Sequence, residues 1–272
     1  MTVSVVWRFA PLATLAVVLP MLLQVAGCSS PPKDESPNAT ADRLYREAKD
    51  DMEAGSYERA IKSLERVEGL AAGSLLAQQA LLDMAYLSWR TGEKAQAITA
   101  IDRFIKLNPS SPALDYAHYL KGVINFNDNL GLMGRLAGQD LSERDQRAAR
   151  DAYQAFKLLV DRFPGSTYTP DARQRMNYIV NSLASYEVHV ARYYFRRGAY
   201  VAAANRAQQT VAEFQQAPAV EEALFILMQS YEKLDLPLLR ESSERVLRQN
   251  FPSSAFLTQG LSARDKSWWK FW

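Results

Sequence analysis

Hydrophobic residues recur every three or four positions over most of the chain, and the pattern is clearest in residues 171–197. Apolar side chains there fall at Met176, Ile179, Leu183, Tyr186, Val190 and Tyr193. This spacing places them on one face of a helix. Because no proline or glycine interrupts the stretch, we predict one long helix from Asp171 to Arg197. Its apolar stripe fits the core of a helical array better than a separate coiled-coil partner.

Proline-containing junctions divide the remaining helical pattern into segments. Each junction closes one helix and opens another, because proline is disfavoured inside a helix but accepted in its first turn. The junctions are 107–112 (LNPSSP), 163–166 (FPGS), 214–218 (FQQAP) and 251–254 (FPSS). Period-2 alternation is rare, and Ala, Leu, Arg, Gln and Glu are abundant, so helix is favoured throughout. The predicted fold class is therefore all-α.

The helices recur in pairs. Pro218 and Pro252 are one tetratricopeptide period of about 34 residues apart, and that repeat is a helix-turn-helix unit. A glycine turn followed by a small packing residue marks three pairs: Gly55 with Ala60, Gly92 with Ala97, and Gly198 with Ala203. We therefore predict a tetratricopeptide-repeat-like superhelical solenoid of about five helix pairs.

The third repeat carries an insertion. Gly122 and Ala152 mark two repeat positions that are separated by far more residues than in a standard repeat. The extra stretch, roughly Asn127 to Arg147, is rich in Gly, Asn and Asp. Such composition indicates a loop with at most a short helix. The predicted division is a signal peptide at 1–27, a lipidated tether at 28–40, N-terminal repeats at 41–128, an insertion loop at 129–147, C-terminal repeats at 148–262 and an aromatic tail at 263–272.

The first 27 residues are typical of a signal peptide. Arg8 is their only charge, and the apolar run from Leu12 to Val25 contains Pro20 and is too short to span a membrane. The segment ends Val-Ala-Gly before Cys28, which resembles a lipobox. That resemblance implies cleavage before Cys28, a diacylglycerol on its thiol and an N-acyl chain on its new amine.

Three acyl chains would anchor the chain firmly, since each buried CH₂ contributes about 0.8 kcal/mol. Ser29 stands where an aspartate commonly retains such proteins at the inner membrane, so the outer membrane is favoured. The alternative is an ordinary secretory signal followed by an incidental cysteine. Cys28 is the only cysteine, however, and cannot form an intramolecular disulfide. Residues 29–40, rich in Pro and Ser, indicate a flexible tether, so the folded part is expected to begin near Ala41.

Composition and motifs do not point to an enzyme. The chain has 32 Lys+Arg and 30 Asp+Glu, a net charge of +2, without the basic excess typical of nucleic-acid binding. His118 and His189 fall in different repeats, so we expect packing or surface roles and no metal site. No phosphate-binding glycine motif or nucleophile elbow is present. A cell-wall hydrolase would need an acid residue in a deep cleft, and no motif marks one.

A solenoid offers an extended concave surface that suits a bound peptide segment. Tyr86, Trp89, Tyr116 and Tyr119 would supply aromatic faces to such a groove, with Asp115 beside them. The alternative is that most of these rings belong to the core between repeats.

Several segments, in order, resemble the BamD (ComL) lipoproteins of the outer-membrane β-barrel assembly machinery. They are 100–109 (AIDRFIKLNP), Asp115-Tyr116-Ala117 with Tyr119 and Gly122, 162–164 (RFP), and 193–200 (YYFRRGAY) continuing to Asn205-Arg206. With the lipobox and the insertion, the likeness spans nearly the whole mature chain. The first repeat departs from the family at 67–73 (VEGLAAG), which weakens residue-level transfer to the groove.

The resemblance implies a periplasm-facing component of that machinery in the outer membrane. Its C-terminal repeats would contact the POTRA domain of BamA nearest the barrel through Arg197, with Arg196 and Tyr200 in the same turn. An arginine at a helix end can pair bidentately with a partner carboxylate, or it can simply complement the helix dipole. The N-terminal repeats would receive unfolded outer-membrane proteins, and other lipoproteins of the machinery would bind. The alternative function is a tetratricopeptide-repeat lipoprotein that scaffolds cell-wall enzymes.

The chain ends in an aromatic tail, 267–272 (SWWKFW). Tryptophans beside a lysine suit a membrane interface. The tail could instead imitate the aromatic C-terminus of an outer-membrane protein, or pack on the last repeat. The sequence leaves these three interpretations open.

Overall fold

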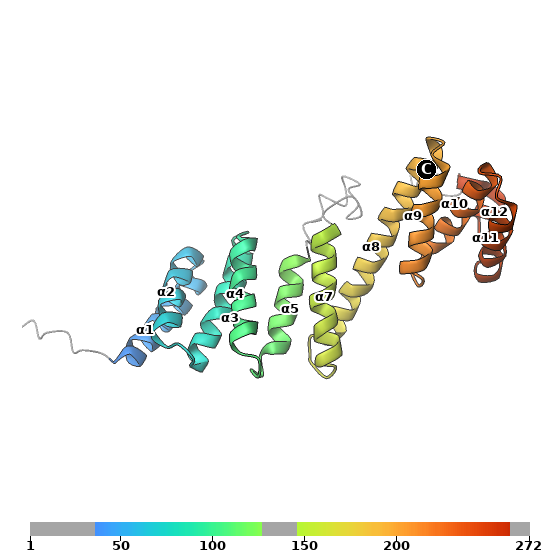
Figure 1. Cartoon of the computed structure of the whole chain (residues 1–272). Coiled ribbons are helices and arrows are strands. Elements are labelled where there is room, and N and C mark those ends of the chain that lie inside the picture. The colour runs from blue at the N-terminus through green and yellow to red at the C-terminus, as the bar shows by residue number, and fades with distance from the viewer. Residues whose placement is uncertain (1–35, 127–145, 262–272) are drawn as a thin grey trace, which may run out of the picture.

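The computed structural model describes residues 36–126 and 146–261, and these ranges contain helices and no strands (Figure 1). The signal peptide, Cys28, the insertion loop up to residue 145 and the aromatic tail lie outside the described residues. The helices are α1 (Pro37–Glu53), α2 (Tyr57–Leu70), α3 (Leu75–Arg90), α4 (Lys94–Leu107), α5 (Leu114–Asn125), α7 (Gln146–Arg162), α8 (Thr169–Arg196), α9 (Tyr200–Glu213), α10 (Val220–Lys233), α11 (Pro237–Asn250) and α12 (Phe256–Gln259).

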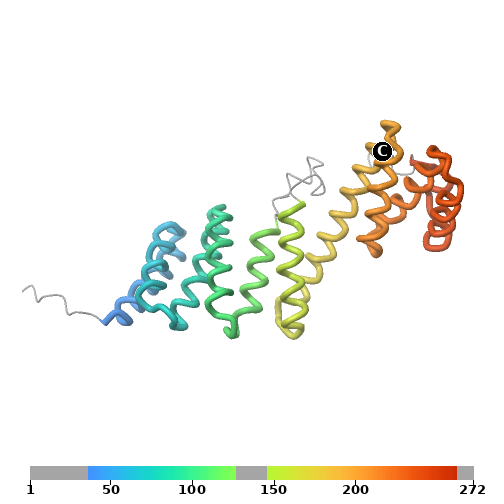
Figure 2. Tube along the Cα trace, viewed as in Figure 1, coloured from blue at the N-terminus to red at the C-terminus, as the bar shows by residue number. Residues whose placement is uncertain are grey.

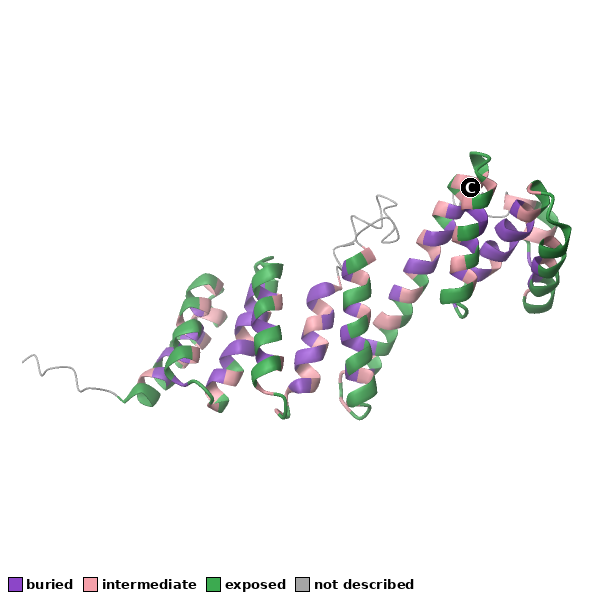
Figure 3. Ribbon diagram, viewed as in Figure 1, coloured by how far each residue is buried: buried purple, intermediate pink, exposed green. Residues whose placement is uncertain are grey.

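Five helix pairs follow one another in chain order (Figure 2). The pairs are α1/α2, α3/α4, α5/α7, α8/α9 and α10/α11, and the second helix of each of the first four pairs also packs on the helix that opens the next pair. Buried residues occur in all of the paired helices, whereas α11 is largely exposed (Figure 3). The predicted all-α, tetratricopeptide-repeat-like solenoid of five pairs is confirmed.

The turn inside four of the five pairs contains a residue with positive φ. Gly55, Gly92 and Gly198 adopt φ values of 74°, 86° and 76° in the turns of the first, second and fourth pairs. Glycine enters this region without the Cβ clash that other residues meet. In the fifth pair Asp235 takes the same role at φ 56°. The sequence pattern missed this turn because it contains no glycine.

The third pair forms although an insertion separates its helices in sequence. α5 packs on α7, and Gly122 makes the close approach possible: a Cβ at this position would lie 2.4 Å from Cε1 of Phe156. Phe156 and Ala152 are fully buried at this contact. Gly122 and the Ala152 region therefore meet in one helix pair across the insertion. α7 already begins at Gln146, so the predicted end of the insertion at Arg147 is slightly late.

The long helix predicted at 171–197 is present as α8, which begins at Thr169 because Pro170 occupies its first turn. The predicted stripe is correct only in its first half, where Ile179 and Leu183 are buried. Further along, Val188 and Ala191 are buried and Tyr193 is exposed. A strict seven-residue repeat drifts around a straight helix, so the buried face moves away from the predicted one.

Two ion pairs with buried carboxylates fasten the C-terminal half of α8. Glu187 accepts from Nη1 of Arg206 on α9 at 2.9 Å, and Glu222 on α10 accepts from Nε of Arg192 at 2.5 Å. Both carboxylates are almost completely buried. Removing one partner would leave an uncompensated buried charge, which is strongly unfavourable. These pairs therefore fix α8 against both neighbouring helices.

The predicted start of the folded part at Ala41 is too late. The side chain of Ser36 accepts a hydrogen bond from N of Ala39 at 3.3 Å and caps α1, with Pro37 in the first turn. The last residues assigned to the flexible tether, 37–40, are thus helical.

His118 is buried with its ring 6.2 Å from that of Phe163, whereas His189 is exposed. Over the described residues no group of three potential metal ligands occurs. None of the described helices has the length and apolar character needed to cross a membrane.

Replacing Gly122 with alanine should destabilise the array. The new Cβ would overlap the Phe156 ring, and overpacking of this kind costs about 1–3 kcal/mol. Thermal unfolding followed by circular dichroism should show a lower midpoint.

Gly69→Ala is the matched control, because Gly69 lies within α2 and a Cβ there meets nothing within 4 Å. Alanine is favoured over glycine inside a helix by about 0.5–1 kcal/mol. The control should leave the midpoint unchanged or raise it. Equal destabilisation by both substitutions would show that the close approach at Phe156 does not matter.

Candidate functional site

Tyrosines and aspartates from the first helices of consecutive pairs meet on one side of the array. Oη of Tyr45 on α1 donates to Oδ2 of Asp83 on α3 at 2.9 Å, and the amide of Gln79 donates to Oδ1 of Asp83 at 3.0 Å. One turn further along α3, the rings of Tyr86 and Trp89 lie 5.9 Å apart. The first two pairs thus share a polar and aromatic surface.

The same surface continues over the third and fourth pairs. Tyr168, just before α8, stacks on Tyr119 with ring centroids 4.8 Å apart and lies 5.6 Å from the ring of Tyr116. Oη of Tyr119 donates to Oδ2 of Asp171 at 2.8 Å, and Nε of Arg175 donates to the same oxygen at 2.6 Å. We call the whole set the tyrosine band: Tyr45, Asp83, Tyr86, Trp89, Tyr116, Tyr119, Tyr168 and Asp171.

Three tyrosines of the band, Tyr45, Tyr116 and Tyr119, have raised pKa values. Burial, with smaller contributions from Tyr168, Asp83, Tyr86 and Tyr119, raises the pKa of Tyr116 to about 12. Burial also raises the pKa values of Tyr45 and Tyr119, and their hydrogen-bonded aspartates add to the effect. The hydroxyls therefore remain donors at any physiological pH. Ring faces, donors and carboxylates in one row suit an extended peptide better than acid–base chemistry.

The structure brings the predicted groove residues together, and it partly supports both interpretations of them. Tyr86, Tyr116 and Tyr119 are half-buried and pack on the cores of the array, while Trp89 keeps 36% of its surface exposed. Asp115 instead holds the local fold: it accepts from Oγ of Ser166 at 2.7 Å and so ties the start of α5 to the turn before α8.

Sequence reasoning missed half of the band: Tyr45, Asp83, Tyr168 and Asp171. No local signal marks these residues, because their contacts join side chains that are far apart in sequence.

The second candidate surface is the turn between α8 and α9. Arg197 ends α8, and the positive φ of Gly198 reverses the chain so that α9 begins at Tyr200. The amide N of Ala199 donates to the carbonyl of Tyr194 at 3.0 Å, which closes the turn. A tight, hydrogen-bonded turn holds its side chains in defined positions.

Two exposed arginines lie at this turn. Arg196 and Arg197 are exposed, and no carboxylate of the described residues lies within ion-pair distance of either. The guanidinium of Arg197 lies over the ring of Tyr193, 5.4 Å from its centroid, and Tyr193 is 53% exposed. The ring of Tyr200 packs edge-on against Phe195 at 5.5 Å. Arg196 and Arg197 are thus available to an acidic partner, whereas Tyr200 is partly used inside the chain.

Comparison with known proteins identifies related sequences over almost the whole described range. Residues 37–247 match the YfiO family, described as "Outer membrane lipoprotein". A protein named outer membrane protein assembly factor BamD from Neisseria meningitidis serogroup B is 47% identical over 233 residues, covering 86% of this chain and 87% of that protein. Proteins of the same name from Xylella fastidiosa (Temecula1) and Haemophilus influenzae are 32% and 33% identical, over 97% and 89% of this chain and 88% and 91% of their own.

Proposed function

The chain belongs to the outer membrane lipoprotein family that includes these BamD assembly factors, and from this premise we propose that it is a non-enzymatic adaptor in outer-membrane protein assembly. The observation that carries the proposal is 47% identity to an assembly factor over most of both chains. A helical array with one aromatic and one cationic surface fits an adaptor that binds two different partners. The alternative, a scaffold for cell-wall enzymes, is not favoured by these relatives.

We assign the tyrosine band to unfolded outer-membrane proteins. The exposed ring of Trp89 and the half-buried tyrosines offer stacking partners for aromatic side chains. Asp83 and Asp171 lie beside these rings, and their carboxylate oxygens would accept hydrogen bonds from a peptide backbone. An extended segment could thus follow the row from α3 to α8.

We assign the α8–α9 turn to BamA. Arg197 and Arg196 would pair with carboxylates of a POTRA domain, since arginine is the side chain best suited to bidentate pairing with a carboxylate. Other lipoproteins of the machinery would bind elsewhere on the array.

Membership of the family places the chain at the outer membrane. We propose that a diacylglycerol and an N-acyl chain on Cys28 hold it there, facing the periplasm, with the residues between Cys28 and α1 setting its reach.

Cys28→Ser should abolish lipid attachment. Cells grown with an alkyne analogue of palmitate should label the wild-type chain and not the variant, because serine offers no thiol to the lipid transferase. Ser29→Ala, which changes the neighbouring side chain, should label normally. Undiminished label on the serine variant would contradict lipidation at this position.

Replacing Tyr86 and Trp89 together with alanine should weaken binding of a C-terminal peptide of an outer-membrane protein. Two aromatic contacts contribute about 0.5–1.5 kcal/mol each, so the Kd should rise roughly tenfold. Fluorescence anisotropy with the purified mature chain measures it.

Tyr193→Ala removes a more exposed ring at the other surface and should leave this Kd unchanged. If the double variant binds as tightly as wild type, the band is not the client surface.

Arg197→Glu should weaken capture of BamA at least tenfold, since a reversed charge repels a carboxylate that the arginine would pair with. Thermal unfolding should be unchanged, because no described carboxylate depends on Arg197. A pull-down with purified POTRA domains measures the loss.

Arg173→Glu is the control, an exposed charge reversal near the other end of the same helix. It should capture BamA normally. Normal capture by the Arg197 variant would count against this contact, and equal loss in both variants would point to a non-specific charge effect.

A further inference from the structure

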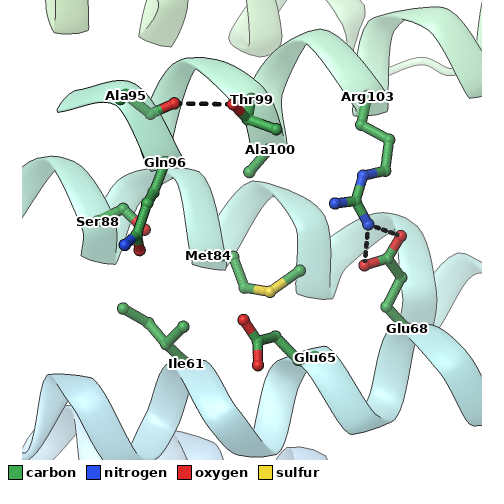
Figure 4. A pocket seen from close by; sticks show the side chains of 10 residues that line it. All are labelled: Ile61, Glu65, Glu68, Met84, Ser88, Ala95, Gln96, Thr99, Ala100 and Arg103. Atoms are coloured by element: carbon green, nitrogen blue, oxygen red, sulfur yellow. Dashed lines mark hydrogen bonds and ion pairs between the residues drawn. The ribbon is translucent and has the colours of Figure 1, made fainter. Parts of the chain in front are cut away.

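A cleft of about 560 Å³ opens between α2 and α4, with α3 as its floor (Figure 4). Ile61 and Glu65 line it from α2, Met84 from α3, and Gln96 and Arg103 from α4. We call it the α2–α4 cleft.

The α2–α4 cleft is independent of the tyrosine band. Successive residues of a helix are about 100° apart, so Met84 and Ser88 lie on one side of α3, and Asp83 and Tyr86 lie towards the other. The second helices of the first two pairs, α2 and α4, form the walls of the α2–α4 cleft. Of the three helices at the cleft, only α3 also contributes residues to the tyrosine band. An occupant of the cleft would not compete with a peptide on the band.

The chemistry of the cleft is divided between an apolar floor and polar walls. Ile61, Met84 and Ala100 present carbon and sulfur atoms to the cleft, whereas Glu65 and Gln96 present polar groups from its two walls. A long side chain with an aliphatic stem and a polar head matches this arrangement, because such side chains bury the stem and keep the head near polar groups.

Glu65 and Glu68, the two glutamates of α2 that line the cleft, differ in their ion-pair partners within the described residues. Both oxygens of Glu68 accept from Nη1 of Arg103, at 2.7 and 2.8 Å. Glu65, one turn earlier, is exposed, and within the described part of the chain no cation lies within ion-pair distance of it. Its neighbours across the cleft, Gln96 and Thr99, carry no charge. The cleft therefore provides an arginine for Glu68 and none for Glu65.

A second hollow of about 310 Å³ continues the cleft beyond the Glu68–Arg103 pair and is lined by Leu81 and by Leu107, which is 61% exposed. Thr99 and Leu107 are two turns apart on α4, a separation of about 12 Å. An extended chain covers that distance in about four residues.

We propose that the α2–α4 cleft is a docking site for an extended segment of another protein. The segment carries a Lys or Arg side chain whose stem lies on Met84 and whose head pairs with Glu65. It also carries an apolar side chain about four residues away, which covers Leu107. The observation that selects this occupant is charge complementarity at Glu65 beside an apolar floor.

Photocrosslinking in the intact outer membrane tests the proposal. The probe is p-benzoylphenylalanine in place of Gln96, in the full chain, with crosslinked residues mapped by mass spectrometry. We expect adducts on a segment of another protein within about four residues of a Lys or Arg. Glu65→Lys should reduce the adduct at least tenfold, and Glu65→Gln should reduce it less. Reversing the mapped partner cation to glutamate should restore the adduct with Glu65→Lys.

Glu241→Lys is the control, since Glu241 is exposed on α11, far along the array (Figure 1). It should leave the adduct unchanged, and circular dichroism should show all variants folded. The proposal is overturned by adducts insensitive to Glu65→Lys, by adducts on this chain's own residues 29–35 or on a second copy, and by the absence of adducts. It stands whether or not the tyrosine band or the α8–α9 turn acts as proposed.

Discussion

The arrangement of the molecule depends on α8 belonging to two hydrophobic cores at once. Its first half packs with α7, where Ile179 and Leu183 are buried, and its second half packs with α9 and α10 through Val188 and Ala191. A helix of 28 residues is about 42 Å long. Because one continuous helix joins the two cores, the C-terminal pairs cannot rotate freely against the N-terminal ones. Asp171 of the tyrosine band and Arg197 of the α8–α9 turn stand near its opposite ends.

The second half of α8 is fastened by charge as well as by packing. Many of its inward positions are small, and the residues they meet on α9 are alanines, so apolar contact alone leaves the register of α8 weakly defined. The pairs Glu187–Arg206 and Arg192–Glu222 form only when α8, α9 and α10 have one particular register. Buried ion pairs contribute little net stability, yet a mismatched register would strand their charges. We infer that they specify the position of the turn that carries Arg197.

The features that the sequence predicts well are those fixed by local chemistry. A turn that requires positive φ calls for glycine, so Gly55, Gly92 and Gly198 reveal three of the pairs. Asp235 makes the same kind of turn in the fifth pair, and the sequence does not reveal it because no glycine is present. The contacts of the tyrosine band join residues such as Tyr45 and Asp83, or Tyr119 and Asp171, that are far apart in sequence. They depend on how neighbouring pairs are stacked, which no local pattern encodes.

Stacking also explains why a single helix can serve two surfaces. A first helix contacts its own partner and the second helix of the preceding pair, so its buried residues, such as Leu81 and Leu87 on α3, occupy the sides between those neighbours. Two faces of α3 remain between these contacts. One carries Asp83 and Tyr86, and the other contributes Met84 to the α2–α4 cleft. Asp83 and Tyr86 keep part of their surface exposed, whereas Met84 lies buried at the base of the cleft. Surfaces on opposite sides of one rigid layer can thus receive different partners at the same time.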